Sequence, residues 1–185
     1  YEVLYRDGVE NAFPDIEEEQ ATTKLIEGLQ LSLGLDNLAK EAPAFINFTH
    51  DCLMQGHPVF LPNDRIVVEI LETVKPGKKL LKACQDLKSK GYILALDDYE
   101  HQNVWRHFYP IVDIIKIDLR ATSFEEVETI KVAIKDFPHI KLLAEKVETY
   151  EEFNKCVEMG FEYFQGYFFS APEVLQSKSM DPGQL

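Results

Sequence analysis

The stretch Tyr92-Ile93-Leu94-Ala95-Leu96-Asp97-Asp98 is an apolar run that follows Gly91 and ends in two adjacent carboxylates. A short aliphatic run bounded by glycine is typical of a strand covered on both faces, as in a parallel sheet with crossover helices. In such sheets, and in α/β barrels, ligands bind at the carboxyl ends of the strands, where Asp97 and Asp98 would lie. The two carboxylates could bind Mg²⁺ or Mn²⁺ there, but for the dipeptide alone a turn that caps the next helix is the commoner structure.

Length, charge and apolar runs exclude several classes of protein. The 185 residues suffice for one sizeable core, and nothing in the composition indicates a second domain. A net charge of −13 argues against the basic stripe of a protein that binds nucleic acid polymers, so an anionic ligand would need metal ions to supply positive charge. The longest apolar runs have the length of strands and no signal pattern is present, so we expect no membrane span and a cytoplasmic location.

The cysteines and histidines carry no recognisable site. Cys52, Cys84 and Cys156 are far apart and odd in number, which is typical of reduced, partly buried thiols and not of disulfides or zinc ligands. The histidines share no metal-ligand spacing, and we expect them on the surface or in loops. The chain begins at Tyr1, inside an apparent strand, so we expect it to be a fragment of a longer protein.

Strand and helix signals alternate along the chain. The predicted strands span residues 1–6, 43–48, 65–72, 92–98, 113–118, 139–144 and 161–164. The predicted helices span residues 23–38, 76–90, 123–136 and 149–160, and the last two begin with capping boxes. This regular alternation predicts a parallel sheet and favours a barrel over an open sheet. Seven strands are one short of eight, so we expect the missing strand upstream of Tyr1 or from a neighbour, since an open edge is avoided.

Polar residues recur within, or directly after, the apolar strands. They are Glu2, Asn47, Glu69, Asp97, Asp98, Lys116, Glu145 and Gln165. An unpaired charge in such a strand costs several kcal/mol, about 3 or more, so these side chains need partners. The mouth of a barrel would bring them together, and five carboxylates with one amide form an all-oxygen shell that suits one or two Mg²⁺ or Mn²⁺ ions.

The alternative is a set of inward-facing salt bridges, such as Lys116 with Asp97 or Glu69. For any single residue the two interpretations are equally good. For the whole set we favour the metal site, because one lysine cannot balance five carboxylates.

In seven ordered segments the chain resembles the EAL domain, the family of cyclic di-GMP phosphodiesterases. The first three are Glu2-Val3-Leu4-Tyr5-Arg6 for E-A-L-L-R, Phe45-Ile46-Asn47-Phe48 for V-N-L-S, and Val68-Glu69-Ile70-Leu71-Glu72 for L-E-I-T-E. The others are Leu96-Asp97-Asp98-Tyr99 for L-D-D-F, Ile115-Lys116-Ile117-Asp118 for L-K-I-D, Leu143-Ala144-Glu145-Lys146-Val147-Glu148-Thr149 for I-A-E-G-V-E-T, and Phe164-Gln165-Gly166-Tyr167-Phe168-Phe169-Ser170 for the closing Q-G-Y-xx-S. The resemblance covers essentially the whole chain.

The resemblance implies a TIM-like (β/α)₈ barrel whose first, antiparallel strand precedes the signature and is missing here. It implies metal-dependent hydrolysis of the second messenger cyclic di-GMP to linear pGpG. One Mg²⁺ or Mn²⁺ would be held by Glu2, Asn47, Glu69 and Asp97, and a second by Asp97, Asp98 and Glu145. Lys116 and Gln165 would lie near the attacking water and act in catalysis with Glu145, while Arg6 would contact a phosphate and Leu4 a guanine.

The loop after the two aspartates departs from the family pattern D-D-F-G-T-G. Glu100 and Gln102 replace the two glycines, so a turn at positive φ is disfavoured, and we expect 99–110 to be irregular, remodelled and mobile unless a ligand or partner orders it. Trp105 in this loop would either pack against the barrel mouth or serve in an interface, and packing is the more common role for a lone Trp. An inactive cyclic di-GMP receptor or protein-interaction module therefore stays open as an alternative, as does a phosphohydrolase with another substrate.

The pattern is most similar to EAL domains that precede an HDOD domain. It implies a barrel domain over residues 1–175 and a linker or tail over 176–185 toward an HDOD-type partner domain. A homodimer is a further expectation.

Overall fold

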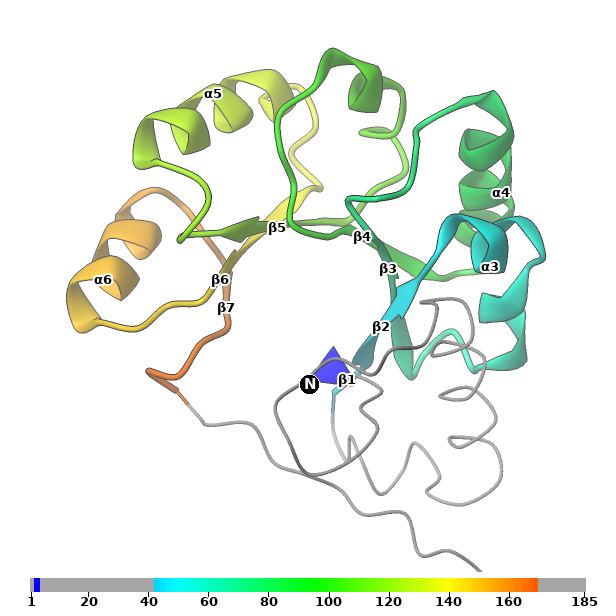
Figure 1. Ribbon diagram of the computed structural model, residues 1–185, viewed down its shortest axis with the longest axis horizontal. Helices are drawn as coiled ribbons and strands as arrows, with labels where there is room; N and C mark the ends of the chain where they lie inside the picture. Colours follow the sequence, from blue (N-terminus) through cyan, green and yellow to red (C-terminus); the bar gives the residue numbers. More distant parts are fainter. Residues whose placement is uncertain (1, 4–41, 170–185) are drawn as a thin grey trace, which may run out of the picture.

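The described strands form one parallel sheet whose order follows the chain (Figure 1). The computed structural model describes residues 2–3 and 42–169, so the predicted helix over 23–38 and the candidate residues Leu4 and Arg6 lie outside the described residues. The strands are β1 (Glu2–Val3), β2 (Ala44–Phe48), β3 (Ile66–Ile70), β4 (Ile93–Leu96), β5 (Ile114–Asp118), β6 (Lys141–Glu145) and β7 (Tyr163–Phe164). Each strand pairs in parallel with the next.

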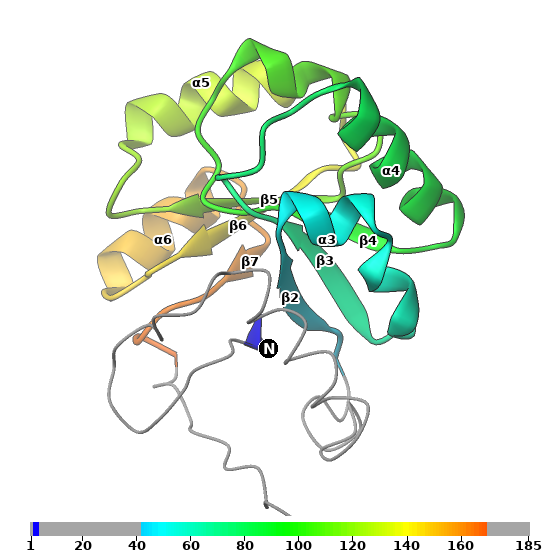
Figure 2. The same cartoon turned by 45° about the vertical axis from the view of Figure 1, so that its right-hand side comes forward.

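The sheet curls around the axis of a barrel, and the helices lie on its outer side (Figures 1 and 2). The helices are α3 (His50–Met54), α4 (Lys78–Ser89), α5 (Phe124–Ile134) and α6 (Tyr150–Glu158), with 3₁₀ helices η2 (His57–Phe60) and η3 (Asn103–His107). Within the part of the chain that is described, β1 and β7 are the two ends of the sheet and no strand is antiparallel. The predicted α/β class and TIM-like architecture are confirmed.

The helices α5 and α6 begin as their sequences predict. The Ser123 hydroxyl accepts a hydrogen bond from the Glu126 N–H at 3.3 Å, and the Glu126 carboxylate accepts one from the Ser123 N–H at 2.8 Å. Thr149 and Glu152 form the same reciprocal pair at the start of α6. These caps satisfy N–H groups that a helix end would otherwise leave without partners. The helices α4, α5 and α6 lie within the predicted ranges and are shorter by a few residues at their ends, whereas α3 lies outside those ranges.

Successive side chains of each strand point to opposite faces of the sheet. The outer face is apolar and packs under the helices, as the buried Val68, Leu94 and Ile115 show. The inner face carries a smaller apolar layer whose members are Val67, Ala95, Ile114 and Leu143. Two positions further along the same strands come Glu69, Asp97, Lys116 and Glu145. The barrel interior therefore changes from apolar to charged toward the carboxyl ends of the strands.

The loop between β4 and β5 is packed through its aromatic side chains. Trp105 is buried and contacts Phe108 edge-on, with 5.0 Å between the ring centres. The hydroxyls of the buried Tyr99 and Tyr109 lie 2.6 Å apart in a hydrogen bond. Trp105 therefore takes the packing role, and η3 is the one regular turn of this irregular loop. Its expected mobility stays a prediction.

Two further expectations concern thiols and membranes. The three cysteines are free and buried, as predicted, and burial raises the pKa of Cys84 to about 12. Over residues 42–169, no helix combines the length and the apolar character that crossing a bilayer requires.

Candidate metal centre

One buried lysine joins three carboxylates at the carboxyl ends of β3 to β6. The Lys116 Nζ donates to Asp97 Oδ1 at 2.7 Å, lies 3.0 Å from Glu145 Oε1 and also contacts Glu69 Oε1. Lys116 and Glu69 are both completely buried. The inward-facing salt bridges that were the alternative to a metal site are therefore present, and four neighbouring strands converge on one ammonium group.

The salt bridges leave the site with excess negative charge. Ligand oxygens of Asp97, Asp98 and Glu145 all lie within 4.8 Å of one another, so one cation could contact all three carboxylates. The second oxygen of Glu145, Oε2, is buried without a hydrogen-bond partner among the described residues. An unsatisfied buried carboxylate oxygen is costly, and a cation would satisfy it. The oxygen-only donor set suits a hard divalent ion.

The pKa values of two carboxyl groups of this site are raised. Burial raises the pKa of Glu145 from 4.5 to about 7; Lys116 opposes this shift, while the charges of Asp97 and Asp98 add to it. Burial and then the charge of Asp97 also raise the pKa of Asp98. Both shifts favour the protonated form of these carboxyl groups when no cation is bound.

Metal binding should therefore be pH-dependent. Because folding raises the pKa of Glu145, proton binding by this carboxyl group stabilises the fold. The stabilisation is complete below the unfolded pKa of 4.5 and is lost as the pH rises through about 7. Mn²⁺ replaces the lost proton, so we expect it to raise the melting temperature more at about pH 8 than at about pH 6. Melting curves with and without Mn²⁺ at the two pH values measure these shifts in melting temperature. Glu145→Gln should make the shift at pH 8 more nearly equal to the shift at pH 6. Equal shifts at the two pH values would contradict the assignment.

The backbone turns sharply at Asp98. Its φ is 37°, in the left-handed region, which aspartate enters more readily than most residues. The turn is held on both sides, because the Asp97 N–H donates to the Ile70 carbonyl at 3.0 Å and the Tyr99 N–H donates to the Lys116 carbonyl at 2.9 Å. A strained backbone that its neighbours hold in place is typical of a functional site.

Gln165 is fixed beside Glu145 by the backbone of β6. The Gln165 N–H donates to the Ala144 carbonyl at 2.8 Å, and the Val147 N–H donates to the Gln165 carbonyl at 2.9 Å. Gly166 follows, and a Cβ there would lie 2.1 Å from the Val147 carbonyl oxygen, so only glycine allows this approach.

The remaining candidates lie at the β1–β2 side of the site. Asn47 on β2 is the register partner of Glu69 on β3. Glu2 lies on β1 opposite Phe45, and its side chain is outside the described residues. The structure thus brings Glu69, Asp97, Lys116 and Glu145 into contact and places Asp98 beside them.

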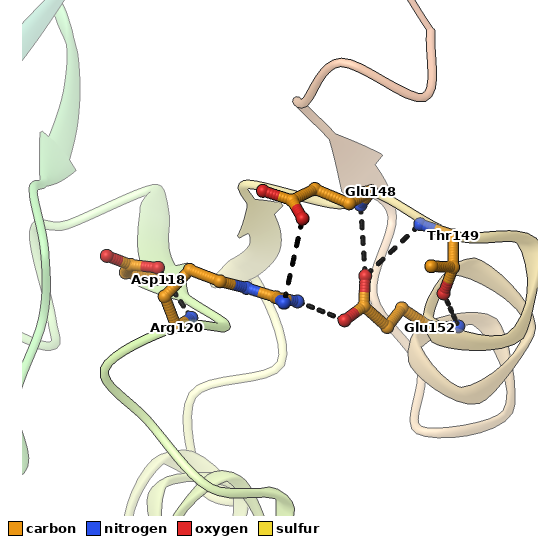
Figure 3. A network of polar contacts seen from close by, with 5 residues as sticks. All are labelled: Asp118, Arg120, Glu148, Thr149 and Glu152. Carbon is orange, nitrogen blue, oxygen red and sulfur yellow. Dashed lines mark hydrogen bonds and ion pairs between the residues drawn. The ribbon is translucent and has the colours of Figure 1, made fainter.

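A polar network that the sequence did not reveal ties together the loops after β5 and β6 (Figure 3). Asp118 accepts a hydrogen bond from the Arg120 N–H at 2.7 Å, and the Arg120 guanidinium reaches Glu148 and Glu152. Glu152 also accepts from the Glu148 N–H at 2.9 Å. Only the position of Asp118, at the carboxyl end of the strand that carries Lys116, could have indicated it. The network holds the loops that border Glu145.

The chain matches a known family over most of its length. The model of the EAL domain matches residues 9–172. The cyclic di-GMP phosphodiesterase CdgJ of Vibrio cholerae is 42% identical over 184 residues, which are 98% of this chain and 43% of CdgJ. The protein YuxH of Bacillus subtilis is 35% identical over 185 residues, 97% of this chain and 45% of YuxH. The chain spans less than half the length of these two relatives.

Solved structures share the fold. The YkuI protein of Bacillus subtilis, with an EAL domain and in complex with its substrate cyclic di-GMP and calcium, superposes with a TM-score of 0.74. The identity is 21%, and the match covers 96% of this chain and 53% of that one. A standalone EAL protein from Vibrio cholerae, bound to cyclic di-GMP, gives a TM-score of 0.63 at 22% identity, over 91% of this chain and 81% of that one.

Proposed function

Since the chain belongs to the EAL domain family, we propose that it hydrolyses one phosphodiester bond of cyclic di-GMP to give linear pGpG, with Mg²⁺ or Mn²⁺ as cofactor. The observation that carries this proposal is the centre at the barrel mouth, where Asp97, Asp98 and Glu145 converge and Glu145 Oε2 has no hydrogen-bond partner among the described residues. The relative CdgJ, named a cyclic di-GMP phosphodiesterase, supports the choice of substrate.

The proposed metal ligands are those that the resemblance to the EAL domain implies. Glu2, Asn47, Glu69 and Asp97 would hold one ion, and Asp97, Asp98 and Glu145 the other. When bound, a divalent ion supplies Lewis-acid activation of a water and neutralises charge on the phosphate. Arg6 would contact a phosphate and Leu4 a guanine.

Lys116 and Gln165 would position the attacking water. The three carboxylates around Lys116 hold its ammonium group in one place and face its three N–H groups, so Lys116 would act on the water through its fixed positive charge. Gln165 is held by hydrogen bonds to β6 and to Val147. Exclusion of bulk water strengthens these interactions, and Lys116 and Glu69 are completely buried.

Turnover distinguishes this function from its alternatives. We expect purified protein with Mn²⁺ to convert cyclic di-GMP to the linear product, and Glu69→Gln to lower turnover by about a hundredfold or more, since it removes one ligand charge. Chromatography of the products measures both. Calorimetric binding of cyclic di-GMP without product would favour a receptor, and turnover of a generic phosphodiester but not of cyclic di-GMP would favour another phosphohydrolase.

We also propose an arrangement for the longer protein. Residues 1–175 would form the barrel domain, and 176–185 would lead toward an HDOD-type domain. The greater length of the relatives supports a further domain. A homodimer and a cytoplasmic location belong to the same proposal.

A further inference from the structure

Lys146 has an unusual backbone for a lysine. It directly follows Glu145 at the carboxyl end of β6, and its φ is 56°. Among the described non-glycine residues, only Asp98 shares a positive φ, and Asp98 lies at the same site. Left-handed backbone costs a residue with a Cβ roughly 1 kcal/mol, which glycine would avoid. A lysine at such a position indicates that its side chain has a use there.

The side chain of Lys146 is anchored next to the metal centre. Its ammonium group donates to Asp118 Oδ2. Asp118 is only 7% exposed, is held by the Arg120 N–H at 2.7 Å, and is the register partner of Glu145 on the neighbouring strand. The ammonium therefore lies over the ends of β5 and β6, where the carboxylate of Glu145 also lies.

The ammonium group of Lys146 lies beside the candidate metal ligands. It pairs with Asp118, which is the register partner of Glu145, and Glu145 directly precedes Lys146 in the chain. Ligand oxygens of Glu145, Asp97 and Asp98 lie within 4.8 Å of one another. The positive charge of Lys146 therefore lies next to the carboxylates that would hold a cation.

We propose that the ammonium group of Lys146 acts as a fixed positive charge beside Asp98 and Glu145. It weakens the binding of a divalent cation to these carboxylates and strengthens the binding of an anionic phosphodiester. The part that concerns the phosphodiester rests on the proposed function. Like charges repel, so the ammonium opposes a metal ion at these carboxylates. The lysine side chain is 55% exposed, so it can contact a ligand that enters the mouth.

Three substitutions of Lys146 separate the effect of its charge from the effect of its left-handed backbone. Lys146→Met removes the charge and keeps the Cβ at positive φ, Lys146→Gly removes both charge and strain, and Lys146→Arg keeps the charge. Lys141→Met is the matched control, because Lys141 lies at the opposite end of β6, paired with Glu162 at 2.8 Å.

Calorimetric titration of the purified full chain with Mn²⁺ tests the effect on the metal. We expect the Met and Gly variants to bind Mn²⁺ about fivefold more tightly than the parent, a change of about 1 kcal/mol. The Arg variant and Lys141→Met should match the parent. Binding by the Met and Gly variants but not by the parent would also support the inference. Equal affinity in parent, Met and Gly variants, or no binding in any of them, would overturn it.

Steady-state kinetics at saturating Mn²⁺ test the effect on the substrate. We expect Lys146→Met to raise KM for cyclic di-GMP about fivefold and to change kcat by less than about twofold, since the charge assists binding before the reaction. An unchanged KM would overturn the phosphodiester role. If the parent binds Mn²⁺ but forms no product, the proposed function fails, while the metal titration still decides the role of Lys146.

Discussion

Replacing Lys116 by methionine should destabilise the metal-free protein by about 3–5 kcal/mol, the usual effect of removing one partner from a buried ion pair. Methionine has a volume similar to that of lysine, so the loss of stability comes from the missing positive charge. Glu69, Asp97 and Glu145 would lose the ammonium group that now contacts all three. Denaturation in urea at neutral pH, with a chelator present, measures the change.

A surface lysine provides the control for this experiment. Lys131 pairs with Glu128 at 3.0 Å on the solvent side of α5, and Lys131→Met should cost less than about 1 kcal/mol. Mn²⁺ should restore part of the stability of Lys116→Met, because the cation neutralises the same carboxylates, whereas turnover should stay lost. A loss below about 1 kcal/mol for Lys116→Met would show that the carboxylates do not depend on this lysine.

Gly166→Ala should destabilise the protein by about 3 kcal/mol or more, because overpacking against rigid backbone cannot be relieved by a rotamer change. The new Cβ would lie 2.1 Å from the Val147 carbonyl oxygen and 2.4 Å from its nitrogen. Relief requires the segment to move away from Val147, which breaks the hydrogen bond to the Gln165 carbonyl. We therefore expect loss of turnover together with the loss of stability.

Gly160 supplies the matched substitution. Its φ is +85° and no atom lies within 4 Å of a Cβ built there, so Gly160→Ala measures the backbone cost alone, about 1 kcal/mol. Urea denaturation of both variants compares the two effects. Equal losses at the two glycines would mean that the contact with Val147 relaxes without difficulty.

The strands and the two capped helices could be predicted because their patterns are local. Alternation of side chains and the Ser123 and Thr149 capping boxes depend on residues a few positions apart. The convergence of Glu69 and Lys116 could be inferred for a related reason. A charge in a buried strand needs a partner, and parallel order brings the strand ends together.

The sequence could not show how the charges pair. That Lys116 would contact three carboxylates at once, and that Lys146 would bind Asp118, depends on distances between different strands. The left-handed backbone at Lys146 had a signal only in the resemblance, because the I-A-E-G-V-E-T segment has glycine at this position. The burial of Trp105 in an aperiodic loop likewise depends on tertiary packing.

Hydrolysis of cyclic di-GMP in water enriched in oxygen-18 tests whether a metal-activated water attacks the phosphodiester. We expect the linear product to carry one labelled oxygen on its terminal phosphate when Mn²⁺ is present, and no product to form when the metal is chelated. Mass spectrometry of the product reads out the label. Unlabelled product, product that forms equally well under chelation, or no product despite bound cyclic di-GMP and Mn²⁺ would contradict this mechanism.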